Sequence, residues 1–308
     1  MKKIAVMEKV NFNQEQVARL RNLGQVDFYD NLTDSQVNQI APQYDATVVN
    51  WIDPTPYLLD MRPGSLVALL STGYGWISNL EMAREQKIFV ANIPGYSTEA
   101  VAEHLLGLLL GLSKRIFPLI GSKSDDGVQG FEIVGKTVGI IGLGHIGTRF
   151  AHIISFFGGN VLTYNRNLKH NPIAKDVTLD ELLTQSDIIV LTPSMNPDSR
   201  GLINNRNIDL INERAVIIGS TWDVITEEAL ITLLSTKNAV AAFDAALEGK
   251  QSITGEVEQS LNKLSAQKKL FLTPHSAYNT VEAERRQLDI CVNNIESFFS
   301  GTMKNIVN

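Results

Sequence analysis

Three glycines, Gly142, Gly144 and Gly147, are the residues whose types and spacing most clearly predict chemistry. They follow the β-branched run 137–141 and lead into the periodic segment 148–157, which is the context that a dinucleotide-binding turn requires. Gly142 permits a tight turn, Gly144 lets the backbone approach a pyrophosphate, and Gly147 allows close helix packing. The amides at the helix N-terminus would hold the phosphates. We predict a nicotinamide or flavin dinucleotide site; a glycine-rich turn without a ligand is the alternative.

The residue that follows the next predicted strand bears on the choice of cofactor. An acidic residue about 20 positions after the glycines would accept hydrogen bonds from the ribose 2′-hydroxyl and repel a 2′-phosphate. This chain has Asn165 there, followed by Arg166, and Lys169 lies close by. Because Arg166 could form a charge-assisted pair with the phosphate, we favour NADP over NAD. The alternative is a solvated Arg166 beside a weaker ribose ligand.

Composition limits the other functions that the chain could have. With 308 residues, 44% hydrophobic and 19% charged, it has the size and composition of a two-domain globular protein. A net charge of −6 without a basic stripe argues against nucleic-acid binding. The single cysteine, Cys291, cannot form an intrachain disulfide, so we expect a cytoplasmic protein. The apolar segment 104–112 is too short to span a membrane and is predicted to be a buried helix.

Short β-branched runs alternate with helical segments along the whole chain, which indicates an α/β protein with parallel sheets. Thr33, Thr178 and Thr226 are predicted helix N-caps, and Ser78 with Glu81 is predicted to form a capping box. The predicted strands are 4–8, 25–29, 46–50, 65–71 and 88–92, followed by 137–142, 160–164, 187–191, 215–219, 239–243 and 270–273.

Two series of strands suggest two domains, with the dinucleotide-binding domain inserted into the first. Pro94 and Gly95 mark the first crossing, because proline removes a hydrogen-bond donor and glycine interrupts regular structure. The second crossing is expected near 274–279. We predict domain boundaries of 1–98 with 277–308 for one domain and 99–276 for the other.

Several motifs together resemble the D-isomer-specific 2-hydroxyacid dehydrogenases. They occur in the order typical of that family, and the PGYST form is similar to its glycerate and hydroxypyruvate reductases. The resemblance implies a flavodoxin-like substrate domain with an inserted Rossmann domain, a homodimer, and reduction of a 2-keto acid by a nicotinamide cofactor. The segments that carry it are 92–112, 135–147, 199–204, 272–278 and 293–308.

The family's catalytic set is only partly present. The resemblance places the catalytic histidine at His275, where an imidazole could protonate an alkoxide as hydride arrives; a turn residue retained for packing is the alternative. It places Thr221 where the family has the arginine that grips the substrate carboxylate, followed by Trp222 and Asp223 in place of small residues. Loss of that arginine forfeits a charge-assisted pair worth about 1.5–3 kcal/mol. We therefore expect a substrate that lacks, or binds differently, the usual carboxylate.

Other roles follow from the same resemblance. Glu248 is one residue early for the glutamate that pairs with the histidine, and a solvated loop carboxylate is the alternative. Asp244 matches an aspartate near the nicotinamide carboxamide, and the backbone amides of Thr72, Gly73 and Tyr74 are predicted to contact the substrate. No metal site is predicted. The predicted cofactor-binding residues are Gly142, Gly144, His145, Ile146, Gly147, Asn165, Arg166, Thr192, Pro193, Ser220, Thr221, Asp244 and His275.

The three tryptophans, Trp51, Trp76 and Trp222, leave two interpretations open. They could line an apolar substrate cleft, or each could pack separately in a core. The altered catalytic set likewise leaves two functions: an NAD(P)-dependent oxidoreductase with an atypical substrate site, or a catalytically silent dinucleotide-binding sensor or regulatory protein. Neither class of function requires a nucleic acid or a membrane as a partner.

Overall fold

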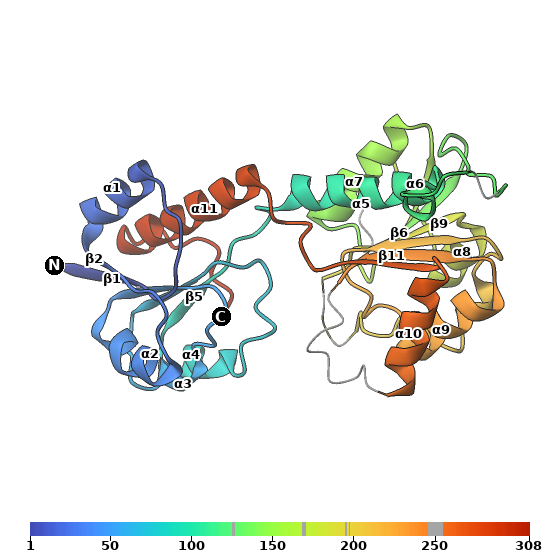
Figure 1. Ribbon diagram of the computed structural model, residues 1–308. Helices are drawn as coiled ribbons and strands as arrows, with labels where there is room; N and C mark the ends of the chain where they lie inside the picture. The colour runs from blue at the N-terminus through green and yellow to red at the C-terminus, as the bar shows by residue number, and fades with distance from the viewer. Residues whose placement is uncertain (125–126, 168–170, 195, 197, 246–254) are drawn as a thin grey trace. The chain divides into compact units, whose positions relative to one another are not determined.

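A computed structural model describes the chain except residues 125–126, 168–170, 195, 197 and 246–254. The contacts within the chain divide it into two compact units. Unit 1 comprises Met1–Ser97 together with Val281–Asn308, and unit 2 comprises Thr98–Thr280. Each unit contains a parallel β-sheet with helices on both faces (Figure 1). The predicted α/β class is therefore confirmed, and each predicted strand begins and ends within two residues of the observed one.

Unit 1 is built on a five-stranded parallel sheet with the strand order β2-β1-β3-β4-β5. This is the flavodoxin-like order, as predicted. Helices α1 and α11 lie together on one face, and α2, α3 and α4 cover the other (Figure 1). The strands are β1 (Lys2–Val6), β2 (Gly24–Phe28), β3 (Ala46–Val49), β4 (Leu66–Leu69) and β5 (Phe89–Ala91); the helices are α1 (Gln14–Leu23), α2 (Asp34–Ile40), α3 (Thr55–Leu58), α4 (Leu80–Glu85) and α11 (Val281–Phe299), with a 3-10 turn at Ala41–Gln43.

Unit 2 is built on a seven-stranded sheet with the order β12-β11-β10-β9-β6-β7-β8. This is the Rossmann order with one further strand, and the chain reverses its direction of winding between β6 and β9. The strands are β6 (Thr137–Ile141), β7 (Asn160–Tyr164), β8 (Lys175–Asp176), β9 (Ile188–Leu191), β10 (Val216–Gly219), β11 (Val240–Asp244) and β12 (Leu270–Thr273); the helices are α5 (Thr98–Ser113), α6 (Ile116–Leu119), α7 (His145–Phe156), α8 (Leu179–Gln185), α9 (Glu227–Thr236) and α10 (Glu256–Ala266), with a 3-10 turn at Ile208–Leu210.

Strands β9 and β10 of unit 2 are apolar at every position because both faces of the sheet are covered. Successive residues point to opposite faces. In β9, Ile189 and Leu191 belong to the core beneath α8, α9 and α10, whereas Ile188 and Val190 belong to the core beneath α5 and α7. A hydrophobic core therefore lies on each face of the sheet, between the sheet and the helices that cover it (Figure 1).

Three of the four predicted helix caps are present. The hydroxyls of Thr33, Thr178 and Thr226 each accept a hydrogen bond from a backbone amide in the first turn of the following helix. The capping box predicted at Ser78 is wrong, because Asn79 caps α4 and its side chain accepts from the Met82 amide at 3.0 Å.

The Asp53 carboxylate is the reason for this difference. It accepts hydrogen bonds from the Ser78 hydroxyl and from Thr55, so Ser78 is held outside the helix. Partial burial alone would raise the pKa of Asp53, but the hydrogen bonds from Ser78 and Thr55 lower it below its usual value. The helix therefore begins one residue later than the pattern predicts.

The apolar segment 104–112 lies within α5, which is largely buried, as predicted. Among the described residues, no helix combines the length and the apolar character that crossing a membrane would need.

Candidate active site

The glycine turn connects β6 to α7, and two of its three glycines are packed against backbone. Gly142 has a φ of +98°, and a Cβ there would lie 2.5 Å from the backbone of Pro193. A Cβ on Gly147 would lie 2.2 Å from the Gly142 carbonyl oxygen. A Cβ on Gly144 would meet nothing within 4 Å. The turn is therefore closed toward the protein and open at Gly144, where a pyrophosphate would approach.

Hydrogen bonds from two neighbouring strands fix this turn. The Thr192 hydroxyl, directly after β9, donates to the Gly142 carbonyl oxygen at 2.9 Å. The Gly142 amide donates to the Tyr164 carbonyl oxygen at the end of β7 at 3.0 Å. Thr192, a predicted cofactor-binding residue, thus supports the turn with its side chain.

A cavity of about 320 Å³ lies beside the turn, at the carboxyl ends of β6, β7 and β9. This is where the winding of the sheet reverses, the position at which doubly wound sheets bind their ligands. Of the predicted cofactor-binding residues, six line it, and the first turn of α7 supplies three more beside it, His145, Ile146 and Gly147. The lining residues are Ile141, Gly142, Gly144, Tyr164, Asn165, Arg166, Asn167, Thr192, Pro193, Ser194, Asn196, Asp198, Ser199 and Leu202. We call this the dinucleotide cavity.

A larger hollow, about 530 Å³, is found in unit 1 beside Met1, Lys2 and Lys3. Its one carboxylate, Asp45, is already bound to the Lys3 amide and the Arg62 guanidinium. It lies where β1 begins, whereas ligands of such sheets bind at the carboxyl ends of the strands. The dinucleotide cavity is therefore the better candidate for a functional site.

The Asn165 side chain faces the glycine turn. Its Oδ1 accepts from the Leu143 amide at 2.5 Å, and its Nδ2 donates to the Thr163 hydroxyl at 3.0 Å. Asn165 therefore holds the backbone between Gly142 and Gly144, and it brings no negative charge to the cavity. Arg166, next to it, is exposed and forms an ion pair with Asp198 from the loop after β9.

The carboxyl ends of β10, β11 and β12 bring together three predicted site residues, Thr221, Asp244 and His275. Thr273, for which the sequence predicted no role, lies with them, and we call these four residues the His275 edge. Asp244, at the end of β11, is 2% exposed. Its Oδ1 accepts from the Thr273 hydroxyl at 2.6 Å and from the Ser276 amide at 2.9 Å, and its Oδ2 accepts from the Ala277 amide at 2.8 Å. Asp244 therefore anchors the turn that carries His275.

His104 extends this network from helix α5. Its Nε2 lies 2.9 Å from the Thr273 hydroxyl oxygen and 3.8 Å from Asp244 Oδ1. Since the Thr273 hydroxyl donates to Asp244, the imidazole Nε2–H of His104 is the group that donates to Thr273. The sequence placed His104 only as the first residue of a predicted buried helix, and the presence of a histidine in the apolar segment 104–112 was the available signal.

His275 has a left-handed backbone, with a φ of +53°, and its amide donates to the Thr273 carbonyl oxygen at 2.8 Å. Such a conformation costs about 1 kcal/mol or more outside glycine, and here the three hydrogen bonds to Asp244 maintain it. The side chain is exposed and meets the edge of the Tyr278 ring, with 6.0 Å between centroids. An exposed imidazole on a fixed turn favours the chemical interpretation over retention for packing.

Thr221, which the sequence predicted to stand at the position of the family arginine, uses its hydroxyl locally. Oγ1 accepts from the Asp223 amide at 3.3 Å, and the Asp223 carbonyl oxygen accepts from the Gly201 amide at 2.8 Å. Ser220 comes directly before it, and the Ser220 amide donates to the Leu191 carbonyl oxygen at 3.3 Å. Thr221 supplies no positive charge at this edge.

The idea that all three tryptophans line one cleft is wrong. Trp222 is 1% exposed and belongs to the core beneath α8, α9 and α10, where it meets Phe243 edge-on at 6.2 Å. Trp76 packs on the core of unit 1 and donates to the Gly73 carbonyl oxygen, whereas Trp51 is 64% exposed. An indole next to Thr221 is accommodated because it points into the core.

The predicted substrate contacts of unit 1 lie in the loop after β4. Its carbonyl oxygens are engaged: Asn92 donates to that of Thr72 at 2.7 Å, and the side chains of Ser71 and Trp76 donate to that of Gly73. Thr72, Gly73 and Tyr74 are exposed. Glu248 lies outside the described residues, and among those described no group of three or more His, Cys, Asp or Glu side chains could hold a metal ion.

Comparison with known proteins decides the family. Residues 107–277 match the family described as D-isomer specific 2-hydroxyacid dehydrogenase, NAD binding domain. The chain belongs to this family. It is accordingly a nicotinamide-dependent oxidoreductase that acts on CH–OH/C=O groups.

Two curated relatives and one solved structure illustrate the likeness. A hydroxypyruvate reductase of Blautia hydrogenotrophica is 28% identical, with 94% of each chain covered. A 2-hydroxyacid dehydrogenase homolog of Haemophilus influenzae is 32% identical over 79% of this chain and 78% of its own. The acyclic imino acid reductase Bsp5, solved with NADPH and D-Arg, has a TM-score of 0.87 at 24% identity, covering 99% of this chain and 100% of its own. At that identity the likeness to Bsp5 concerns the fold.

Proposed function

We propose that this dehydrogenase uses NADP to reduce a 2-keto acid or a related carbonyl compound at an altered substrate site. The observation that carries the choice of cofactor is the wall of the dinucleotide cavity, where Asn165 faces inward and Arg166 supplies a positive charge. A carboxylate in place of Asn165 would repel a 2′-phosphate, and a guanidinium binds one through charge-assisted hydrogen bonds.

The glycine turn and the first turn of α7 have the features required to hold the pyrophosphate. Gly144 leaves open space, and the amides at the start of α7 point out of the helix. The bound nicotinamide would supply the hydride. In this proposal His275 donates the proton to the oxygen of the reduced carbonyl group, and the fixed turn restricts the imidazole to a narrow range of positions.

The same edge limits the substrate. Thr221 cannot form the bidentate pair that an arginine forms with a carboxylate, and Asp223 adds a negative charge nearby. We infer that the substrate carboxylate, where there is one, is held by neutral donors, and we propose the amides of Thr72, Gly73 and Tyr74. Among the described residues, no acceptor takes a hydrogen bond from these three amides. Glu248 keeps its proposed role as a partner of His275.

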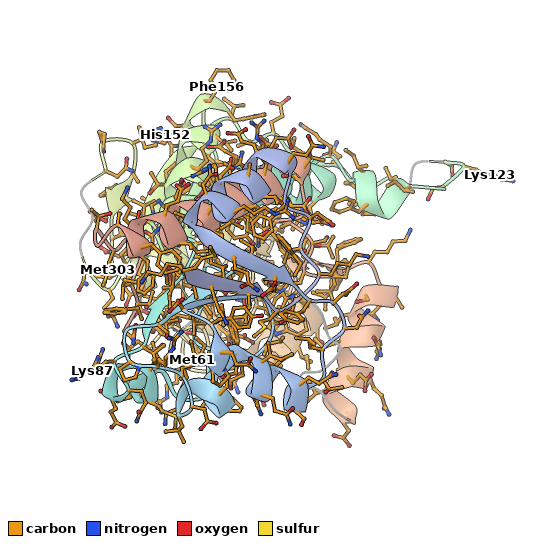
Figure 2. The ribbon with its side chains drawn as sticks, turned by 90° about the vertical axis from the view of Figure 1, so that its left-hand side faces the viewer. Met61, Lys87, Lys123, His152, Phe156 and Met303 are labelled. Carbon is orange, nitrogen blue, oxygen red and sulfur yellow. The ribbon has the colours of Figure 1, made fainter. Side chains whose placement is uncertain are left out.

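We also propose that the protein is a cytoplasmic homodimer. Unit 2 exposes large apolar side chains that a second copy could cover, and Phe156 at the end of α7 is 90% exposed (Figure 2). Ile116, Ile120 and Val134 are also exposed in this unit. Sedimentation of the wild type and of Phe156→Ser tests this, since a dimer that uses this surface should dissociate more readily in the variant.

Two measurements on the wild type test the main proposal. Fluorescence titrations with NADPH and NADH should give tighter binding of NADPH, and tighter binding of NADH would contradict the cofactor choice. A panel of hydroxypyruvate, glyoxylate, pyruvate and bulkier ketones with NADPH should then reveal turnover. Binding without turnover of any compound would favour the silent sensor that the loss of the arginine suggests.

A further inference from the structure

The ion pair between Arg166 and Asp198 joins two residues of the wall of the dinucleotide cavity. It lies next to Asn165, where the proposed NADP would place its 2′-phosphate. Both residues line the cavity, and they come from different strand ends, Arg166 after β7 and Asp198 after β9. Arg166 Nη1 donates to Asp198 Oδ2. The only guanidinium in the described lining is therefore already paired with a carboxylate of the protein.

From this geometry we propose that Asp198 is a specificity-determining residue, which competes with the cofactor's 2′-phosphate for Arg166. The inference rests on the proposed use of NADP. NADPH must displace Asp198 to reach the guanidinium, whereas NADH carries no group that requires the exchange. Asp198 thus lowers the preference for NADPH that Asn165 and Arg166 create, and it brings the affinities for the two cofactors closer together.

The exchange is physically feasible because the pair is exposed. The side chains of Arg166 and Asp198 are 67% and 66% accessible, so water screens the attraction and the pair is weak. A 2′-phosphate carries more charge than a carboxylate and offers three acceptor oxygens, so it forms the stronger pair with a guanidinium. An exposed carboxylate therefore weakens the binding of the phosphate without preventing it.

The neighbouring side chains make Asp198 the specific competitor. Asn165 is fixed to Leu143 and Thr163, and Asn196, which also lines the cavity, is neutral and holds the amides of Asp198 and Ser199. The Asp198 amide is therefore held by a hydrogen bond, and the Asp198 carboxylate is the one negative charge among the described lining residues.

The test measures the dissociation constants of NADPH and NADH for the whole protein and for Asp198→Asn. We expect roughly a three- to tenfold gain in NADPH affinity, almost no change for NADH, and a smaller difference at high salt because the interaction is screened. Asp209→Asn is the matched control, since Asp209 is exposed in the same unit and does not line the cavity. An equal gain in the control would overturn the proposal.

A second variant separates competition for Arg166 from simple repulsion of the phosphate by Asp198. In Arg166→Gln the replacement Asp198→Asn should have no effect on NADPH affinity, whereas direct repulsion predicts the same gain in both backgrounds. Binding of 2′-AMP relative to 5′-AMP should follow the same pattern. The cofactor proposal fails if the wild type binds NADH more tightly than NADPH. The role of Asp198 fails separately, if Asp198→Asn leaves the ratio of the two dissociation constants unchanged.

Discussion

The dinucleotide cavity lies at the reversal point of one parallel sheet, and the His275 edge lies at the carboxyl ends of β10, β11 and β12 in the same sheet. The two regions differ in what holds their residues in place. In the cavity, backbone atoms leave no room for side chains at Gly142 and Gly147. At the His275 edge, a buried carboxylate holds a turn through hydrogen bonds, and Thr221, the residue predicted at the position of the family arginine, carries no charge. We infer that the residues for cofactor binding and those for substrate recognition can change independently of each other along one sheet.

The largest expected effect on stability and cofactor binding comes from substitutions in the glycine turn. Gly142→Ala should destabilise the protein by about 2–4 kcal/mol, because its positive φ and the backbone of Pro193 leave no place for a Cβ. Gly144→Ala should leave the melting temperature nearly unchanged and weaken NADPH binding more than tenfold, since its methyl group occupies the pyrophosphate's space. Thermal unfolding and fluorescence titration measure both. A stable Gly142→Ala protein with wild-type binding would contradict the geometry.

A gain of function at the His275 edge is the next largest effect. Thr221→Arg should raise kcat/KM for pyruvate or glyoxylate by roughly ten- to a hundredfold, as expected for one charge-assisted pair with a carboxylate. Trp222 does not obstruct the new side chain, because its indole lies in the core. Thr221→Gln is the control of similar length without charge. If neither variant gains activity, the substrate pocket differs from those of related enzymes at further residues as well as at Thr221.

A smaller effect is expected from the support of His275. Thr273→Val removes the hydroxyl that links His104 to Asp244, so the turn should loosen and kcat should fall roughly tenfold with little change in NADPH affinity. Faster amide hydrogen exchange at Ser276 and Ala277 would report the loosening directly. Thr273→Ser, which keeps the hydroxyl, should restore both properties. Unchanged amide hydrogen exchange at Ser276 and Ala277 in Thr273→Val would show that Thr273 does not support the turn that carries His275.

The smallest effect concerns cofactor choice. Asn165→Asp should shift the preference toward NADH by roughly three- to tenfold, because a carboxylate accepts from the ribose hydroxyl and repels the 2′-phosphate. The change also removes the amide donor to Thr163, so Asn165→Ser serves as a control that removes this donor without adding charge. Equal shifts in both variants would mean that packing, and not charge, sets the preference.

The comparison also explains how far the sequence could predict the molecule. Spacing alone predicted the glycine turn, since its residues are close together in the chain and each glycine has a steric reason. Alternating apolar runs predicted the strands and the α/β class, and the family resemblance implied the strand orders. The glycine turn and the strands depend on local physics.

The His275 edge could be predicted only in part. Its network joins His104, Asp244 and Thr273, which are far apart in sequence, and no local pattern reports hydrogen bonds across neighbouring strands. The sequence left Trp222 open between a cleft and a core for a similar reason: Thr221 next to it lies at the edge, whereas the indole turns into the core. The competition of Ser78 and Asn79 for the start of α4 was decided by Asp53, which comes from another loop.

The most direct test of proton donation by His275 compares His275→Asn with the wild type. NADPH oxidation is measured with the same carbonyl panel, and NADPH is titrated into both proteins. We predict that the two bind NADPH within about threefold of each other, and that the variant loses roughly a hundred- to ten-thousandfold in kcat. Equal oxidation rates in the two proteins, with NADPH bound normally, would contradict the proposal that His275 is the proton donor of the reaction.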